Sequence, residues 1–260
     1  MQARDVKGSL RALLWDVDGT LAETELDGHR IAFNRAFAQQ GLPWQWDRST
    51  YIELLAISGG RERLRWFLQR QRQQGGEPEA SLLDALHQAK QAHYRELVVA
   101  GEVQLRPGVR RLIKAAAAAG LQQAIVTTSG REAVAALLEN QLRDQSRLLP
   151  LRICADDVGA KKPDPEAYVL ALQRLGLDPG QAVALEDSQA GLAAATAAGL
   201  RCLVTLSTAS SQDSASLFRA ASSLTDGLGE PTAPIRVLRG PACAGGLITL
   251  SYLEQLPPVP

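Results

Sequence analysis

The stretch LLWDVDGTLAE, residues 13–23, decides the fold of this chain and most of its chemistry. Its apolar start ends abruptly at Asp16, and a second carboxylate, Asp18, follows two positions later, just before Gly19. Residues i and i+2 of an extended segment point to the same side. Asp16 and Asp18 can therefore face one site while Val17 turns into the core. The competing interpretations are an ordinary Asp-Gly turn and a calcium-binding EF-hand loop. The EF-hand pattern fails, because it needs another Asp or Asn before the glycine and a Glu at its twelfth position.

Beyond this stretch the hydrophobic pattern changes twice. From Glu23 to about Ala100 apolar residues recur at three- and four-residue steps, which is typical of amphipathic helices. From Arg106 onward strand-like and helix-like segments alternate, and this alternation predicts a parallel sheet with helices on both faces. The expected strands are 11–15, 122–127, 182–185 and 201–205, and the expected helices of this part are 106–120, 163–176 and 188–199.

The predicted fold class is therefore α/β, with a doubly wound, Rossmann-like parallel sheet as the core domain and an inserted α-helical cap domain. The core domain is expected at residues 1–22 and 104–260, and the cap domain at residues 23–103. Residues 206–245, which are rich in Ser, Ala, Gly and Pro, are expected to form loops around short elements.

Composition narrows the class of partner. The 260 residues carry a formal net charge of zero, so the chain has no electrostatic footprint for nucleic acid or an anionic membrane. No apolar run approaches the length of a transmembrane helix, and the polar N-terminus lacks the pattern of a signal peptide. The three widely spaced cysteines, Cys154, Cys202 and Cys243, indicate free thiols in a reducing cytoplasm. We therefore expect a cytoplasmic monomer that acts on a small molecule.

Ligands of open α/β sheets bind beyond the carboxyl ends of the strands, and polar residues gather there in this sequence. They are Asp16 and Asp18, the hydroxyl residues Thr127, Thr128 and Ser129, then Lys162, and finally Glu186 and Asp187. A third carboxylate beside the Asp pair would give the oxygen-rich site that Mg²⁺ prefers. The hydroxyls suit a phosphate oxygen, and Lys162, held extended by Pro163, can neutralise charge. Helix capping by Asp187 and a solvated surface role for Lys162 are the structural alternatives.

In this order, DVDGT (16–20), Thr127, the pair 162–163 and the pair 186–187 resemble the four motifs of the haloacid dehalogenase-like hydrolase superfamily over roughly residues 11–205. The resemblance implies that Asp16 is the nucleophile that forms an aspartyl-phosphate, and that Asp18 is the general acid and then the base. It implies that the cap is the superfamily's α-helical C1 cap. It also implies roles for the remaining residues: Mg²⁺ on Asp16, the Asp18 carbonyl and Asp187 with Glu186 in support, phosphoryl binding by Thr127, Thr128 and Ser129, and charge balance by Lys162.

Substrate choice is expected to depend on the cap. Its candidate polar residues are Glu25, His29, Arg61, Arg63, Arg65, Lys90 and His93, although most charged cap residues simply form the solvated faces of helices. Four segments, 22–37, 58–64, 161–168 and 184–192, together resemble the CbbY family, phosphatases of xylulose-1,5-bisphosphate that are similar to β-phosphoglucomutase. That resemblance implies that Glu25 and His29 meet the sugar, and that Arg61 and Lys90 bind the phosphate that is not cleaved.

The sequence thus predicts a Mg²⁺-dependent sugar-bisphosphate phosphatase that converts xylulose-1,5-bisphosphate to xylulose 5-phosphate and phosphate. A β-phosphoglucomutase-type mutase shares every core motif and stays open as an alternative. A haloacid dehalogenase would need no Mg²⁺ and would lack the acid at Asp18. A catalytically silent binding protein on the same fold is the remaining alternative, and the intact set Asp16, Asp18, Lys162 and Asp187 argues against it. The tail after residue 205 matches no motif.

Overall fold

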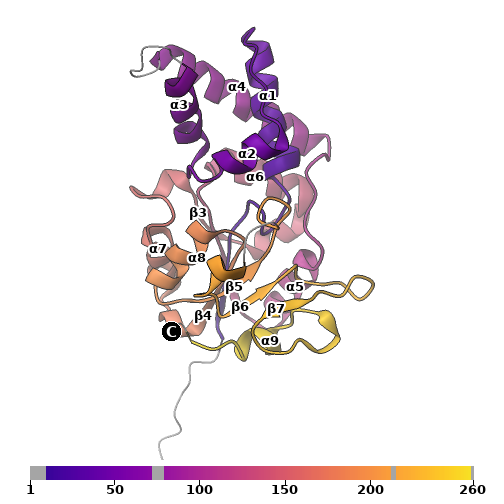
Figure 1. Cartoon of the computed structure of the whole chain (residues 1–260). Coiled ribbons are helices and arrows are strands. Elements are labelled where there is room, and N and C mark those ends of the chain that lie inside the picture. The colour runs from indigo at the N-terminus through magenta and orange to yellow at the C-terminus, as the bar shows by residue number, and fades with distance from the viewer. Residues whose placement is uncertain (1–9, 72–78, 212–214, 259–260) are drawn as a thin grey trace, which may run out of the picture.

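A computed structural model describes residues 10–71, 79–211 and 215–258, so residues 1–9 of the expected core domain lie outside the described part. The core is a seven-stranded sheet in the order β3-β2-β1-β4-β5-β6-β7, drawn in Figure 1. Neighbouring strands are parallel except β7, which runs antiparallel to β6. The strands are β1 (Ala12–Trp15), β2 (Gln122–Val126), β3 (Leu151–Ile153), β4 (Ala182–Glu186), β5 (Arg201–Thr205), β6 (Ser223–Thr225) and β7 (Val237–Arg239).

Helices cover both faces of this sheet, because the side chains of each buried strand alternate between the faces. In β1, Leu13 and Trp15 join one apolar cluster, whereas Ala12 and Leu14 join the other. Figure 1 shows α7 and α8 on one side, and α5 and α9 on the opposite side. This arrangement confirms the predicted doubly wound α/β core. The helices of the core are α5 (Val109–Ala118), α6 (Arg131–Gln141), α7 (Glu166–Leu175), α8 (Gln189–Ala197) and α9 (Leu250–Glu254).

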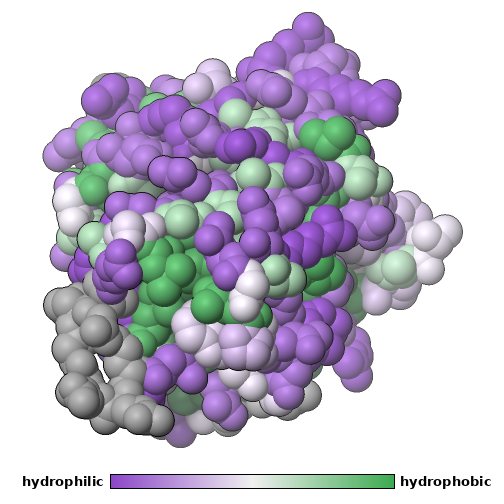
Figure 2. Space-filling model, turned by 90° about the horizontal axis from the view of Figure 1, so that it is seen from above, coloured by the Kyte–Doolittle hydropathy of each residue, from purple (hydrophilic) through white to green (hydrophobic). Residues whose placement is uncertain are grey.

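The segment between β1 and α5 is helical and lies at one end of the sheet (Figure 1). It has its own apolar cluster, in which Phe33, Phe37 and Trp46 pack ring against ring. Seen from this end, the surface is mostly hydrophilic (Figure 2), as amphipathic helices around a separate core require, and it includes a hydrophobic patch. The elements are the π-helix η1 (Glu25–His29), α1 (Arg30–Gln39), α2 (Arg48–Leu54), α3 (Gly60–Gln71) and α4 (Ala80–Val99). We call this segment the cap.

The tail after β5 forms loops around short elements, as its composition predicts, and some of these elements complete the core. Strands β6 and β7 extend the sheet, and α9 packs into the same apolar cluster as α5. Arg111 of α5 fixes the tail by donating to the carbonyls of Leu228, Gly229 and Ile248. Three-residue strands show no usable periodicity, and for this reason the sequence did not place them.

Other elements differ little from expectation. Helix α5 begins at Val109, because Gly108 takes a left-handed φ of 88° and ends the preceding turn. The three cysteines are free, as predicted. None of the described helices is long and apolar enough to cross a membrane. The short 3₁₀ helices are η2 (Arg143–Leu148), η3 (Ala155–Asp157), η4 (Pro179–Gln181), η5 (Ala215–Phe218) and η6 (Ala244–Gly246).

Candidate active site

Strand register brings the polar strand ends together. Trp15 of β1 lies level with Ile125 of β2 and with Leu185 of β4, and β1 runs between these two strands. The three strands therefore end in step, and the residues that follow them emerge at one edge of the sheet. This edge lies where the strand order reverses direction, the usual ligand-binding position of open α/β sheets.

Lys162 links two of these strand ends. Its Nζ atom lies 2.7 Å from Asp16 Oδ1 and 2.6 Å from Glu186 Oε1, and it donates to the carbonyl of Val126 at 2.8 Å. These three partners use all three of its donors. Burial by itself would lower the pKa of Lys162, but the charges of Asp16 and Glu186 outweigh burial and raise it. Lys162 is therefore a fixed ammonium ion between two buried carboxylates, and the surface alternative does not apply.

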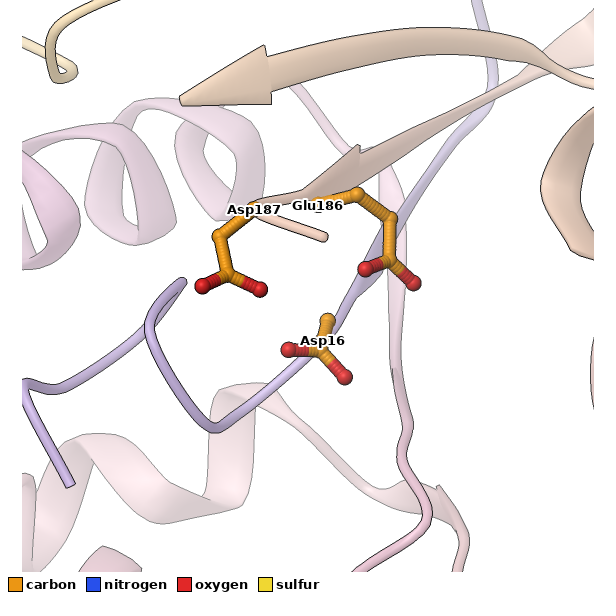
Figure 3. Close-up of side chains that lie close together, drawn as sticks. All are labelled: Asp16, Glu186 and Asp187. Carbon is orange, nitrogen blue, oxygen red and sulfur yellow. The ribbon is translucent and has the colours of Figure 1, made fainter. Parts of the chain in front are cut away.

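Asp16, Glu186 and Asp187 form a buried carboxylate cluster with oxygens within 4.8 Å of one another (Figure 3). Burial, with the charges of nearby Glu186 and Asp18, raises the pKa of Asp16 to about 8 against the opposing charge of Lys162. Burial and the charge of Asp16 likewise raise the pKa of Asp187 well above its usual value. Burial and mutual repulsion therefore oppose ionisation of these carboxyl groups, and the fully ionised cluster would carry more negative charge than Lys162 compensates.

An added cation fits this excess of carboxylate charge, and the all-oxygen donor set is the one that Mg²⁺ prefers. In Figure 3 the carboxylates of Asp16 and Asp187 face a common space, which makes these two residues the candidate ligands. Glu186 is differently engaged, since its Oε1 accepts from Lys162 and Tyr168, and its Oε2 lies against Gly191. Glu186 therefore acts on the cluster mainly by holding Lys162.

Gly19 shows why the opening motif needs glycine at this point. Its φ of +79° lies in the left-handed region, which side chains rarely adopt. A Cβ atom at this position would also lie 1.9 Å from Asp187 Oδ2 and 3.0 Å from Ser207 Cβ. Glycine therefore lets the first loop approach the carboxylate at the end of β4.

Asp18 occupies a different electrostatic environment from Asp16. It accepts hydrogen bonds from the hydroxyls of Thr24 and Ser129, and its Oδ1 lies 3.0 Å from His29 Nε2. Burial would raise the pKa of Asp18, but the charge and hydrogen bond of His29 and the two hydroxyl bonds outweigh burial and lower it. In this structure Asp18 is thus held as an ionised carboxylate by its hydrogen-bond partners.

The three hydroxyl residues of the loop after β2 have different roles: two make hydrogen bonds within the protein and one lines the cavity. Thr127 is buried, and its Oγ1 accepts from the amide of Ser129 at 3.0 Å. Thr128 lines the cavity beside Asp16 and Asp18. Ser129 is committed to Asp18 through its hydroxyl. The sequence predicted all three residues as phosphate ligands. In the structure their hydrogen bonds and positions differ, so they cannot all contact a phosphate in the same way.

A cavity of about 620 Å³ lies above this edge and extends into the cap. Its size is typical of small-molecule sites. On the cap side Glu25 accepts from Tyr51 at 2.6 Å, and Arg63 donates to the same Tyr51 hydroxyl at 2.9 Å, with its guanidinium 3.9 Å from Glu25. The charged residues of the lining are Asp16, Asp18, Glu25, Glu53, Arg63, Lys162 and Asp187.

Three cap residues lie elsewhere than expected. Arg61 is 40% exposed and pairs with Asp84, outside the cavity lining. Lys90 is buried beside the rings of Phe33 and Tyr94, also outside the lining, and burial lowers its pKa to about 8. His29 is buried, where it bonds Asp18 and stacks on Tyr94 at 4.1 Å, so the structure gives it a partner other than a sugar.

Two residues of the site carried little signal in the sequence. Arg63, and not Arg61, lines the cavity. The available sequence signal was its position four residues before the half-buried Phe67, which places both side chains on the same face of α3. Ser207 lies beside Asp187, and its hydroxyl lowers the pKa of that carboxyl. Ser207 lies in the loop after β5, where no pattern was available to place it.

Comparison with known proteins agrees with this geometry. The family model described as haloacid dehalogenase-like hydrolase matches residues 10–199. The chain is 44% identical over 229 residues to the protein CbbY (plasmid) of Cupriavidus necator, which covers 87% of this chain and 89% of that protein. It is 46% identical over 197 residues to CbbY of Rhodobacter capsulatus, with 75% and 85% covered.

Two solved structures extend the comparison. CbbY from Rhodobacter sphaeroides in complex with phosphate is 42% identical with a TM-score of 0.75, covering 83% of this chain and 93% of that one. The same protein as a mutant in complex with xylulose-(1,5)bisphosphate is 40% identical with a TM-score of 0.77, covering 92% and 100%. The chain therefore belongs to the haloacid dehalogenase-like hydrolase family and, within it, to the CbbY proteins, and it is a phosphatase.

Proposed function

We propose that the protein is a Mg²⁺-dependent sugar-bisphosphate phosphatase that acts through an aspartyl-phosphate, and that it hydrolyses xylulose-1,5-bisphosphate to xylulose 5-phosphate and phosphate. The observation that carries this proposal is the distribution of charged side chains between the two ends of the cavity. Lys162 and the carboxylate cluster lie at its core end, and the guanidinium of Arg63 lies at its cap end. With Mg²⁺ bound at the cluster, a molecule with an anionic group at each end would match this distribution, and a similar protein has been solved with such a molecule bound.

The chemistry divides between the two aspartates. A carboxylate oxygen of Asp16 attacks phosphorus, and the bond from phosphorus to the sugar oxygen breaks while Asp18 protonates that oxygen. Asp18 then takes a proton from water, which attacks the phosphorus of the aspartyl-phosphate and releases inorganic phosphate and free Asp16. The second step needs Asp18 in its ionised form, which is the form that its partners favour in this structure. An incoming phosphate dianion raises the pKa of Asp18 and favours the protonated form for the first step.

The remaining residues position the phosphoryl group and neutralise its charge. Lys162 keeps a positive charge beside Asp16, and the loop that contains Thr128 lines the position of the transferred phosphoryl group. Asp16, Asp187 and the backbone carbonyl of Asp18 would hold Mg²⁺, which when bound neutralises phosphoryl charge as a Lewis acid. Such catalysis depends on positioning and electrostatic stabilisation.

For the distal phosphate we propose Arg63, with Glu25 facing the sugar, because both line the cavity whereas Arg61 and Lys90 do not. Arg63→Lys keeps a charge but loses the planar fork. We expect it to lower kcat/KM for xylulose-1,5-bisphosphate by about 10- to 100-fold, the loss of one or two charged hydrogen bonds, with a much smaller effect on a sugar monophosphate. The ratio of the two values is the measurement, because a general folding defect lowers both values alike.

Arg61→Lys is the matched control, two residues away on the same helix and paired with Asp84 on the surface. It is expected to leave the bisphosphate-to-monophosphate ratio unchanged. A changed ratio in Arg61→Lys with an unchanged ratio in Arg63→Lys would restore the assignment that the sequence favoured.

Phosphate release from a panel of sugar phosphates tests the proposed activity. We expect the highest kcat/KM with xylulose-1,5-bisphosphate in Mg²⁺ and loss of turnover in EDTA that Mg²⁺ restores, because the buried carboxylates need the cation to accept a phosphate dianion. ³¹P NMR identifies the products. An isomeric sugar phosphate in place of inorganic phosphate would establish a mutase. Full turnover in EDTA would show that the reaction does not need Mg²⁺.

A further inference from the structure

Arg106 is a buried arginine at the point where the second cap linker enters the core. Its Nη1 donates to the carbonyl of Gly19, and also to the carbonyl and hydroxyl of Thr205 at 3.0 and 2.9 Å. Its Nη2 donates to the carbonyl of Leu206 at 2.6 Å, and its Nε lies 3.0 Å from Glu23 Oε1. Every nitrogen of the guanidinium thus has a protein partner. Arg106 is not among the residues that line the cavity.

These partners belong to three segments that the site needs together. Gly19 is the turn that approaches Asp187, and Glu23 lies on the first cap linker. The two linkers are also joined by their backbones, since the Arg106 amide donates to the Leu21 carbonyl at 2.9 Å. Arg106 therefore ties the opening loop and both linkers to the end of β5.

The loop that follows β5, residues 206–210, connects Arg106 and its partners to Asp187, the proposed metal ligand. Ser207 in this loop lies beside Asp187, because a Cβ atom at Gly19 would lie 1.9 Å from Asp187 Oδ2 and 3.0 Å from Ser207 Cβ, and its hydroxyl lowers the pKa of Asp187. The same hydroxyl lies 3.1 Å from that of Ser210, which lines the cavity. The same loop is held from the other side, because Glu23 Oε2 accepts from the Thr208 amide at 3.2 Å. Arg106 and Glu23 thus hold the loop at Leu206 and Thr208, the two positions that flank Ser207.

We infer that Arg106 is a positioning residue: with Glu23, it holds the loop 206–210 so that Ser207 fixes the orientation of Asp187. The inference rests on the proposed function, in which Asp187 binds Mg²⁺. Partners that orient a metal ligand usually change metal affinity by about 10- to 100-fold when they are removed. Lysine cannot replace Arg106, because a single ammonium cannot donate in the planar fork that reaches Gly19, Thr205 and Leu206 at once.

Arg111 provides the matched control for this inference. It lies on the neighbouring helix α5 and, like Arg106, donates to several backbone carbonyls, but those carbonyls belong to the tail at Leu228, Gly229 and Ile248. Arg106→Lys and Arg111→Lys therefore remove the same kind of interaction. Only the first of these changes lies next to the loop that contacts Asp187.

The test measures binding of Mn²⁺ alone to the full chain, by the electron paramagnetic resonance signal of the free ion, with melting temperature recorded for every variant. We expect Arg106→Lys to weaken Mn²⁺ binding by about 10-fold or more, and Arg111→Lys to leave it unchanged although both lower the melting temperature. Ser207→Ala is expected to weaken binding similarly. If Arg106 acts through Ser207, the double variant Arg106→Lys/Ser207→Ala binds little more weakly than either single variant.

Glu23→Gln keeps the test decisive if Arg106→Lys does not fold. It removes the charge that faces Arg106, and we expect weaker Mn²⁺ binding. Its control is Glu132→Gln, because Glu132 pairs with Arg95 of the cap on the exposed surface, away from the loop. Unchanged Mn²⁺ affinity in a folded Arg106→Lys or Glu23→Gln protein overturns the inference, and so does full additivity with Ser207→Ala.

The wild-type protein and Asp187→Asn separate this inference from the proposed function. Mn²⁺ binding by the wild type that is lost in Asp187→Asn supports the metal site, whatever Arg106→Lys then shows. Absence of Mn²⁺ binding by the wild type would overturn the metal site and the role of Arg106 together.

Discussion

Replacing Asp16 by asparagine is expected to lower kcat for xylulose-1,5-bisphosphate by at least about 10⁴-fold, the scale seen when one member of a nucleophilic constellation is removed. The amide keeps the size of the side chain but cannot attack phosphorus. The fold should survive, because asparagine still offers an oxygen to Lys162, 2.7 Å away. Phosphate release at saturating substrate and Mg²⁺ measures the loss, and circular dichroism confirms the fold.

Asp144→Asn is the control for this chemical change, since Asp144 is exposed in the 3₁₀ helix η2. It is expected to keep wild-type turnover. Retention of full activity in Asp16→Asn would contradict the role of Asp16 as the nucleophile and would favour direct attack of water on phosphorus.

Replacing Lys162 by methionine is expected to damage both stability and catalysis. Lys162 is almost fully buried between Asp16 and Glu186, and removal of one partner of a buried ion pair costs about 3–5 kcal/mol of unfolding free energy. Loss of one preorganised charged donor at a reacting group lowers kcat by about 10²- to 10³-fold. Urea denaturation measures the first effect, and phosphate release from the folded fraction in Mg²⁺ measures the second.

Lys161→Met is the control, because this neighbouring lysine pairs with Glu62 on the surface. A partly exposed pair contributes about 0–1 kcal/mol, so little change is expected in either measurement. Equal effects of the two substitutions would show that the buried position of Lys162 does not matter.

The convergence of the candidate core-site residues could be predicted from the sequence, because their signals are local and lie at strand ends. Asp16, Lys162 and Asp187 each follow or precede a segment with a clear pattern, and the parallel topology brings such ends to one edge. The same reasoning predicted the doubly wound sheet, since β1, β2, β4 and β5 are apolar runs that alternate with helical segments along the chain. Agreement of several strand ends carried more information than any single motif.

The cap residues were harder to predict, because the direction of a side chain on a short helix depends on packing. Arg61 and Arg63 are both arginines of α3, but one pairs on the surface while the other enters the cavity. The position of Ser207 was beyond local sequence patterns, since a loop after β5 reaches Asp187 only through the folded sheet. Arg106 carried no signal either, as its partners lie up to 100 residues away.

The most direct test of the account is a rapid-quench experiment with enzyme in excess over xylulose-1,5-bisphosphate that carries ³²P at the cleaved phosphate. In Mg²⁺ we predict that label appears transiently on the protein, is released by hydroxylamine as expected of an acyl phosphate, and maps to the peptide that contains Asp16. No label is expected on Asp16→Asn. Release of labelled phosphate with no label on Asp16 at any time, from milliseconds to completion, would contradict the aspartyl-phosphate mechanism.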